Sequence, residues 1–438
     1  MPHLAYILFT FALGSCVGSF LNVVVWRLPR VERFENEGIF RDFYRSWRAL
    51  SWPPSHCPKC NKLLKWYDNL PVIGWIKLGG RCRFCHEPIS IRYPIIEAIT
   101  GLLFVLYYVM FFMVGIGPCL HALMPDGVVR FLPAGLNIAD HWPIYLLDMG
   151  LVSGLLAASL IDAELFIIPL EIPWFIVPFA LLEHAVFDRP GWPGALNPSA
   201  PSAALAAGAG VGLLISFVLW WLKLIPSSFA EGGPMLEVEK EALARQKQQK
   251  QGEHSSVLEY EAQEPPDFTP AQIRAEMRKE MLFLLPPLAL GLAWVVLTTK
   301  VRALAQFWGS VSDIGWVSGL LGSVQGLLVG GFVVWITRIL GSFGFGREAM
   351  GMGDVHLMAA VGAVLGAGAA TVAFFLAPFF GIALAIWLLF TGKRRELPYG
   401  PYLSLASAFV ILFYCPIADW LSPGLTGLVE MISKAVGG

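Results

Sequence analysis

The sequence has 438 residues, of which 56% are hydrophobic and only 14% are charged. About a quarter of the residues of an ordinary soluble domain are charged, and the mean hydropathy here is +0.62. So much apolar surface does not fit inside one soluble core, so lipid is the expected solvent. The formal net charge of −1 gives no sign of a nucleic-acid partner. Composition therefore predicts an integral membrane protein.

Apolar runs long enough to cross about 30 Å of hydrocarbon recur along the chain. The first run, Leu4 to Trp26, lacks the basic start and small-residue cleavage site of a signal peptide, so we expect it to remain as a membrane helix. The eighth run is short enough to be a half-span. We predict an all-α integral membrane protein with about ten transmembrane helices. The expected spans are 4–26, 95–117, 143–161, 170–187, 203–225, 281–299, 314–340, 355–368, 369–391 and 401–421.

Lysine and arginine are concentrated in residues 27–93, 223–280 and 393–395, and are sparse in the alternate loops. Positively charged loops stay on the cytoplasmic side of a membrane. We therefore expect these three segments in the cytoplasm and both chain ends on the opposite side. The same orientation places the ends of the third and seventh spans at the cytoplasmic face.

Two long polar stretches divide the chain. Residues 27–93 contain aromatic residues, proline, glycine and four cysteines, which favours a compact cytoplasmic loop. Residues 228–280 are dominated by Gln, Glu, Lys and Pro, which is typical of a solvated linker with helical patches. The expected segments are 1–26, the first transmembrane helix; 27–93, the cysteine loop; 94–227, a membrane domain; 228–280, the polar cytoplasmic linker; and 281–438, a second membrane domain.

The four cysteines of the loop form two C-x-x-C pairs, Cys57 with Cys60 and Cys82 with Cys85. Two such pairs can converge as four thiolates, the closed tetrahedral set that suits structural zinc. Because all four positions are filled, a catalytic zinc with bound water is disfavoured, and two chance pairs of reduced thiols are the simplest alternative. The other cysteines lie in or beside apolar runs, and we expect them to be small core residues; they are Cys16, Cys119 and Cys415.

Two acidic residues lie at the edges of predicted spans, where ionisable groups are costly and therefore informative. Asp162 closes the third span, and Asp354 follows Gly351-Met352-Gly353 directly before another apolar run. Two carboxylates in a poorly solvated site tend to share one proton, so that one can activate water while the other donates to a carbonyl. The simpler reading is that each residue caps a helix or faces lipid headgroups.

These residues, taken in order with a set of short motifs, resemble the type IV prepilin leader peptidases, membrane aspartic proteases with a Gly-x-Gly-Asp motif. The resemblance covers most of the chain except 228–313 and parts of 30–52. The matching motifs are Gly18-Ser19-Phe20-Leu21-Asn22-Val23-Val24, Arg27-Leu28-Pro29, Asn69-Leu70-Pro71-Val72, Gly80-Arg81-Cys82-Arg83, Ile89-Ser90-Ile91-Arg92-Tyr93-Pro94, Glu97, Gly101, the Asp162 segment, Glu348-Ala349-Met350-Gly351-Met352-Gly353-Asp354 and Pro398-Tyr399-Gly400-Pro401.

The resemblance implies a multi-pass enzyme of the bacterial cytoplasmic (inner) membrane that cleaves the basic leader of a prepilin or pseudopilin at the cytoplasmic face. It further implies N-methylation of the new terminus with S-adenosylmethionine, a function linked in the family to the cysteine loop. The family's catalytic aspartates correspond to Asp162 and Asp354. The chain departs from the family pattern at Leu170, where Asp or Asn is usual, and at His356, where Lys is common.

Three alternatives remain open at this stage. The first is a peptidase without methyltransferase activity. The second is a transporter whose intramembrane acids relay ions, which would place those acids near the middle of broken helices. The third is a non-catalytic membrane scaffold with a zinc loop. The sequence assigns no role to residues 228–313.

Overall fold

The computed structural model describes residues 2–31, 39–57, 59–123, 129–133, 135–189, 191–229, 268–390 and 398–436. The chain forms two compact units, Met1–Ala158 with Ile411–Gly438, and Ser159–Val410. Most of the expected linker, residues 230–267, lies outside the described residues. Its last part is helical, because the helix that holds the sixth expected span begins at Pro270.

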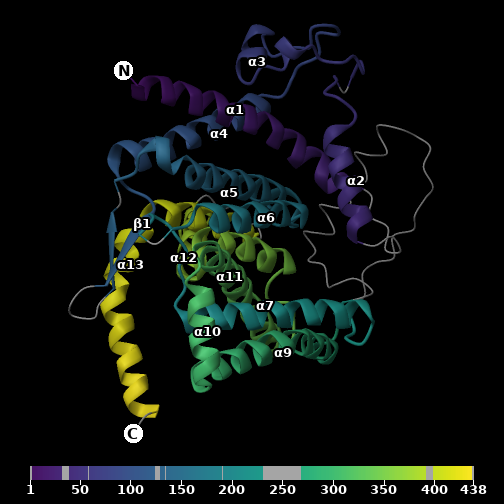
Figure 1. The fold of residues 1–438 in the computed structure, drawn as a ribbon. Coiled ribbons are helices and arrows are strands. Elements are labelled where there is room, and N and C mark those ends of the chain that lie inside the picture. Colours follow the sequence, from purple (N-terminus) through teal and green to yellow (C-terminus); the bar gives the residue numbers. More distant parts are fainter. Residues whose placement is uncertain are drawn as a thin grey trace. The chain divides into compact units, whose positions relative to one another are not determined.

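The first unit contains α1 (Pro2–Arg27), η1 (Leu28–Arg30), α2 (Ile39–Ser51), η2 (Trp66–Asp68), α3 (Ile73–Lys77), α4 (Arg92–Val109), η3 (Met110–Val114), β1 (Cys119–Leu123) and β2 (Val129–Pro133). The helices α5 (Ile138–Leu165) and α13 (Gly400–Val436) belong partly to each unit. The second unit contains α6 (Glu171–Phe187), α7 (Ala200–Trp221), α9 (Pro270–Lys300), α10 (Arg302–Ser312), α11 (Gly315–Phe345) and α12 (Met352–Phe390) (Figure 1).

Eight helices of the described residues are long and apolar enough to cross a membrane, so the chain is an all-α, multi-pass membrane protein. We expected about ten spans, and two local features account for the difference from the eight helices counted among the described residues. Helix α6 has only 17 residues, and α12 is one element that bends at Gly366, close to the boundary between two expected spans. The backbone at Gly366 has a φ of +83°, which favours glycine.

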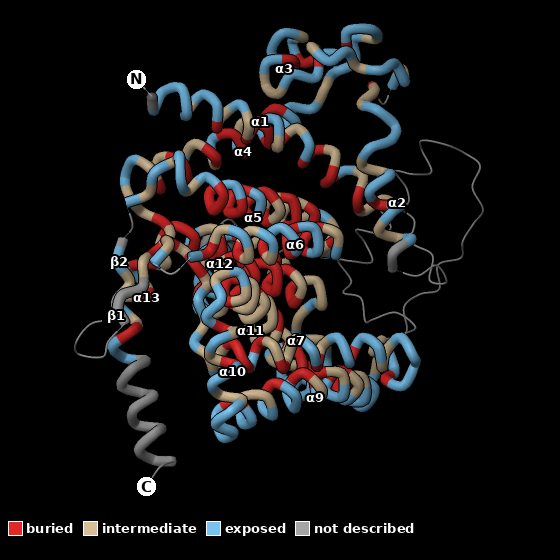
Figure 2. The backbone as a smooth tube through the Cα atoms, viewed as in Figure 1, coloured by how far each residue is buried: buried red, intermediate tan, exposed pale blue. Residues whose placement is uncertain are grey.

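Glycines let α11 and α12 pack backbone to backbone. A β-carbon added at Gly326 would lie 1.9 Å from the carbonyl oxygen of Gly362, and one at Gly362 would lie 2.0 Å from that of Gly326. Small residues at helix contacts allow such close approach in membranes. The first part of α12, residues 354–364, is almost entirely buried, and Figure 2 shows buried backbone around the α12 label. This packing fixes the start of α12, where Asp354 lies.

A proline explains a polar contact between α7 and α9, which lie side by side (Figure 1). Pro287 lies inside α9 and has no N–H to donate to the carbonyl four residues earlier, that of Phe283. The hydroxyl of Ser216 on α7 donates to this carbonyl at 2.7 Å. Both helices can therefore stay long although α9 contains prolines.

In the first unit, several motif residues join α1 to α4. A β-carbon at Gly18 would lie 2.8 Å from the Cα of Glu97, so this position requires glycine. The side-chain amide of Asn22 donates to the carbonyl of Tyr93 at 3.2 Å. These residues of the sequence motifs therefore have a direct packing role.

Our expectation of small core residues holds for the burial of Cys119 and Cys415 but missed their covalent pairing, and it was wrong for Cys16, which is exposed. Cys119, at the start of the antiparallel pair of strands β1 and β2, forms a disulfide with Cys415 in α13. Both lie within the first unit. The sequence separation of 296 residues left no local signal for this pairing, whereas Cys16 remains a free thiol.

Candidate active site and metal centre

Each C-x-x-C pair lies in a tight turn of the same design. In the first, the Cys57 N–H donates to Lys62 O and the Asn61 N–H donates to Cys57 O. In the second, the Cys82 N–H donates to Glu87 O and the His86 N–H donates to Cys82 O. The residue after the second cysteine has positive φ in both turns, 55° at Asn61 and 56° at His86. Such paired turns point the two sulfurs of each pair in one direction.

The two turns bring all four cysteine sulfurs within 4.8 Å of one another. The Sγ atoms of Cys57 and Cys85 are 3.7 Å apart, and those of Cys60 and Cys82 are 4.0 Å apart. Zinc–sulfur bonds of about 2.3 Å in a tetrahedron require sulfurs roughly 3.8 Å apart. Hydrogen bonds from the backbone of Cys85 and Phe84 lower the pKa of the Cys82 thiol. The donor set therefore fits a four-coordinate zinc ion.

Two polar contacts hold the rest of the loop in place. Arg83 forms a two-pronged ion pair with Asp68, and this hydrogen bond holds the pKa of the Asp68 carboxyl below its usual value. Val72 adopts a φ of 60°, which is unfavourable for a β-branched residue. Its N–H donates to Glu97 Oε2 of α4 at 2.7 Å. The motif residue Glu97 thus ties the loop to the membrane helix.

The two candidate aspartates are both buried and both lie at helix ends in the second unit. Asp162, in the last turn of α5, is 5% exposed, and Asp354, in the first turn of α12, is 7% exposed. The Asp354 carboxylate accepts a hydrogen bond from the N–H of Gly351, as the acid of a capping box does. Gly353 has no room for a side chain, because a β-carbon there would lie 2.9 Å from Ile168 Cβ.

Residues at the start of α13 contact Asp162 and lie near Asp354. The Gly400 N–H donates to Asp162 Oδ2 at 3.0 Å, and a β-carbon at Gly400 would lie 2.6 Å from the same oxygen. Burial and the nearby Asp354 carboxylate raise the pKa of Tyr399 to about 12, so this phenol stays neutral. Asp162 and Asp354 are themselves close enough to interact electrostatically.

This arrangement agrees with both interpretations of the aspartates, as helix-capping residues and as a catalytic pair. Each carboxylate stabilises a backbone N–H at a helix start, as a capping residue does. Their proximity in a buried site also meets the requirement for a pair that shares a proton and activates water.

A buried network behind Asp354 was missed by the sequence analysis. Arg338 of α11 is 2% exposed; it contacts Glu280 of α9 at 3.3 Å and donates to Glu348 and to the carbonyl of Met350. Trp335 Nε1 donates to Glu280 at 2.7 Å. The network therefore holds the segment that leads into Asp354. An arginine in an apolar span was the signal available in the sequence.

A second acidic and histidine group lies at the end of α6. Glu183, His184 and Asp188 approach within 4.8 Å. The ring of His184 is engaged at both nitrogens, with Asp188 at 3.0 Å and with the carbonyl of Val364 at 3.0 Å. That carbonyl lies just before the bend at Gly366. We interpret this group as a brace for the bent helix, because the histidine has no nitrogen left for a metal.

The two departures from the family pattern lie near α6. Leu170 directly precedes this helix, and the His356 ring lies 5.8 Å from that of Trp174.

Two family models match the chain. The bacterial peptidase A24 N-terminal domain matches residues 12–111, and the type IV leader peptidase family matches residues 283–386. The second match includes Asp354, and Asp162 lies between the two. Residues 283–313, which we expected outside the family's pattern, fall inside the second match, so that expectation was wrong for them.

Curated relatives carry the name prepilin leader peptidase/N-methyltransferase. The protein from Myxococcus xanthus is 36% identical over 37% of this chain and 43% of its own length. That from Pectobacterium carotovorum is 31% identical over 48% of this chain and 63% of its own length. That from Klebsiella pneumoniae is 37% identical over 35% of this chain and 67% of its own length. The chain thus spans less than two thirds of the first two. No solved structure matches.

Proposed function

The chain belongs to the type IV leader peptidase family, and we propose that it is an aspartic endopeptidase that removes the basic leader of prepilins or pseudopilins. The observation that carries the proposal is the approach of two buried aspartates, Asp162 and Asp354, around the Tyr399–Gly400 segment. The names of the relatives supply the substrate class.

In the proposed reaction, the two carboxyl groups hold one proton between them. The ionised carboxylate takes a proton from a bound water as the water oxygen attacks the carbonyl carbon of the scissile peptide bond. The protonated partner donates a hydrogen bond to the carbonyl oxygen, which gains negative charge. The C–N bond then breaks, and a proton passes to the departing amine. The glycines beside Asp354 allow the substrate backbone to approach closely.

A second activity is proposed from the relatives' names, methylation of the newly exposed N-terminal amine with S-adenosylmethionine as the methyl donor. We further propose that Cys57, Cys60, Cys82 and Cys85 hold a structural zinc ion. The sulfur separations support this assignment. Four protein ligands leave no position for water, so the metal would stabilise the loop rather than hydrolyse a bond.

The proposed location is the bacterial cytoplasmic (inner) membrane, with the cysteine loop and the aspartate pair at its cytoplasmic face. The basic segments of the sequence support this orientation. The positions of the aspartates disfavour the transporter alternative, because each lies within four residues of a helix end rather than in the middle of a span.

The test is cleavage of a prepilin by aspartate variants of the full-length protein in membranes. Asp162→Asn and Asp354→Asn should each abolish cleavage, because an amide neither activates water nor takes its proton. Both variants should insert normally. Asp313→Asn, which neutralises an exposed carboxylate elsewhere in the second unit, is the matched control and should cleave normally. Cleavage near the wild-type rate by either site variant would exclude the assignment.

A further inference from the structure

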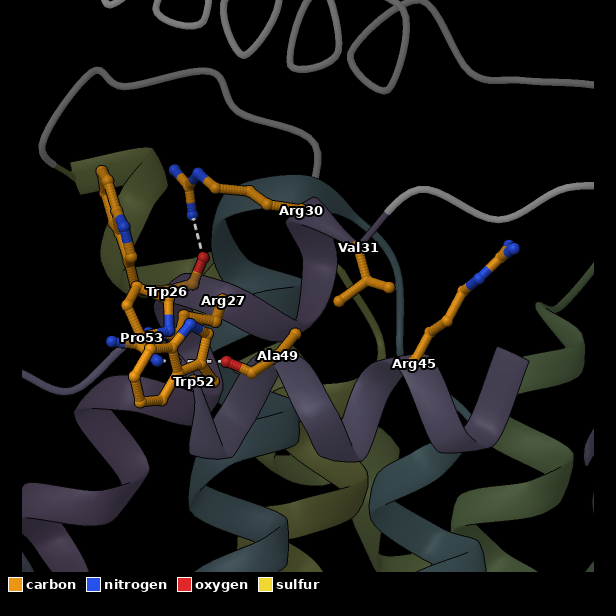
Figure 3. A pocket seen from close by; sticks show the side chains of 8 residues that line it. All are labelled: Trp26, Arg27, Arg30, Val31, Arg45, Ala49, Trp52 and Pro53. Atoms are coloured by element: carbon orange, nitrogen blue, oxygen red, sulfur yellow. Dashed lines mark hydrogen bonds between the residues drawn. The ribbon is translucent and has the colours of Figure 1, made fainter. Parts of the chain in front are cut away.

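A basic pocket of about 560 Å³ lies in the first unit, between the end of α1, η1 and α2 (Figure 3). Three arginines contribute to its lining together with two tryptophans, and no acidic side chain is among the described residues that line it. The residues on which the following argument rests are Trp26, Arg27, Arg30, Arg45, Ala49 and Trp52.

Internal contacts keep this pocket formed. Arg27 Nη1 donates to the carbonyl of Ala49 at 3.1 Å, which fastens α2 to the end of α1. The guanidinium of Arg30 stacks 3.6 Å above the ring of Trp26 and also donates to the Trp26 carbonyl. Figure 3 shows both hydrogen bonds, with Trp52 beside Arg27, while Arg45 projects from α2 on the other side of Val31. The cationic groups are thus presented by a fixed backbone.

The position of the pocket along the chain places it at the level of lipid headgroups. The first candidate membrane span ends at Arg30, so the pocket begins where the hydrocarbon ends. Tryptophan is enriched at this level of a bilayer. Helix α2 carries Phe43, Trp47 and Leu50 together with Arg41, Arg45 and Arg48, a pattern typical of helices that lie in the membrane surface.

We propose that this pocket binds the phosphate of an anionic phospholipid headgroup. Basic pockets at the cytoplasmic end of membrane helices recognise such headgroups by charge and by guanidinium hydrogen bonds. The acyl chains would continue into the bilayer beside α1, whose residues Phe9 and Phe20 are exposed. A cationic ligand such as S-adenosylmethionine, with its sulfonium and ammonium groups, fits three arginines poorly.

The test uses the full-length protein, purified in a neutral detergent and stripped of lipid. Binding of phosphatidylglycerol, phosphatidylcholine and inorganic phosphate is measured by native mass spectrometry and by thermal stabilisation. Phosphatidylglycerol should bind and stabilise the protein, whereas phosphatidylcholine and millimolar inorganic phosphate should not.

Two arginines of the same helix provide a matched pair of variants. Arg45→Gln should weaken phosphatidylglycerol binding by about tenfold, the effect of losing one charge-assisted hydrogen bond. Arg48→Gln removes the same charge one turn further along α2, outside the pocket lining, and should change binding by less than about twofold. Arg45→Lys keeps the charge and should retain most of the binding, which separates loss of the site from misfolding.

Three outcomes would overturn the proposal. Equal losses in Arg45→Gln and Arg48→Gln would mean general attraction to a negative surface rather than a built pocket. Binding of inorganic phosphate at the same affinity would assign the pocket to a free anion. If S-adenosylmethionine displaced the bound lipid from the wild type but did not bind to Arg45→Gln, the pocket would be assigned to the methyl donor.

Discussion

Replacement of Arg338 by methionine tests whether the buried network behind Asp354 positions this proposed catalytic residue. The side chains of Arg338 and Glu280 are 3% and 2% exposed, and their charged groups are 3.3 Å apart. Methionine fills much of the same volume but removes every donor. Glu280 would then keep only the hydrogen bond from Trp335, and Glu348 and the Met350 carbonyl would lose the guanidinium.

Removal of one partner from a buried ion pair costs about 3–5 kcal/mol, because the other charge remains buried without compensation. We expect a loss of this size in the free energy of unfolding. The double change Glu280→Gln with Arg338→Met removes that charge as well, so it should be less destabilising than Arg338→Met alone. Arg274→Met, which removes an exposed arginine bound to the Phe343 carbonyl, should cost about 0.5 kcal/mol or less.

Unfolding in mixed micelles gives the stability, and prepilin cleavage gives the activity. At a temperature where the double variant is fully folded, its cleavage rate should still fall on the order of 10–100-fold if Asp354 has the proposed role, since small displacements of a catalytic group have effects of this size. Wild-type cleavage by the folded double variant would show that Arg338 stabilises the helices without positioning Asp354. A stability loss no larger than that of Arg274→Met would refute the reasoning on burial.

Three further predictions concern other parts of the chain. Elemental analysis should find about one zinc per chain, lost in Cys57→Ser and Cys85→Ser but retained in Cys16→Ser, which changes a free cysteine outside the tetrad; a metal-free wild type would contradict the zinc assignment. Gly362→Ala should destabilise the second unit by about 1–3 kcal/mol, because its β-carbon would lie 2.0 Å from Gly326 O. The control Gly309→Ala, whose β-carbon would meet nothing within 4 Å, should be neutral. Equal melting temperatures of the two variants would count against the tight helix contact. Deletion of residues 234–267, which spares the Thr269 cap of α9, should leave prepilin cleavage largely intact because the composition of this stretch is that of a solvated linker; loss of cleavage in a normally inserted deletion variant would disprove the linker interpretation.

Most of the membrane helices were predictable from hydrophobic length, but length did not show that two expected spans form the single bent helix α12. The cysteine tetrad was also predictable, since the spacing of Cys57, Cys60, Cys82 and Cys85 is itself the signal. The approach of Asp162 and Asp354 was inferred from orientation and from the resemblance, because it depends on how α5, α12 and α13 pack. Helix packing of this kind leaves no periodic pattern in the sequence.

The polar contacts between helices were not predictable. Arg338 and Glu280 are separated by 58 residues, and Glu280 lies at the end of the expected linker, where an acidic residue carries no special information. The contact of Ser216 was likewise not predictable. Its partner is the backbone carbonyl of Phe283, which lacks a helical partner because Pro287 has no N–H. Sequence patterns reveal which segments enter the membrane more readily than they reveal the polar groups that those segments share.

The disulfide between Cys119 and Cys415 has a consequence for how the chain is assembled. Disulfides persist on the oxidising side of a bacterial membrane, whereas thiolates for zinc require a reducing compartment. With the proposed zinc site and the proposed orientation, one chain needs both environments, and the disulfide and the tetrad should react from opposite faces with a thiol reagent that does not cross lipid. Since Cys415 follows Cys119 by 296 residues, the disulfide can close only after the helices between the two cysteines have been synthesised and inserted, whereas the cysteine loop precedes them all and can fold earlier.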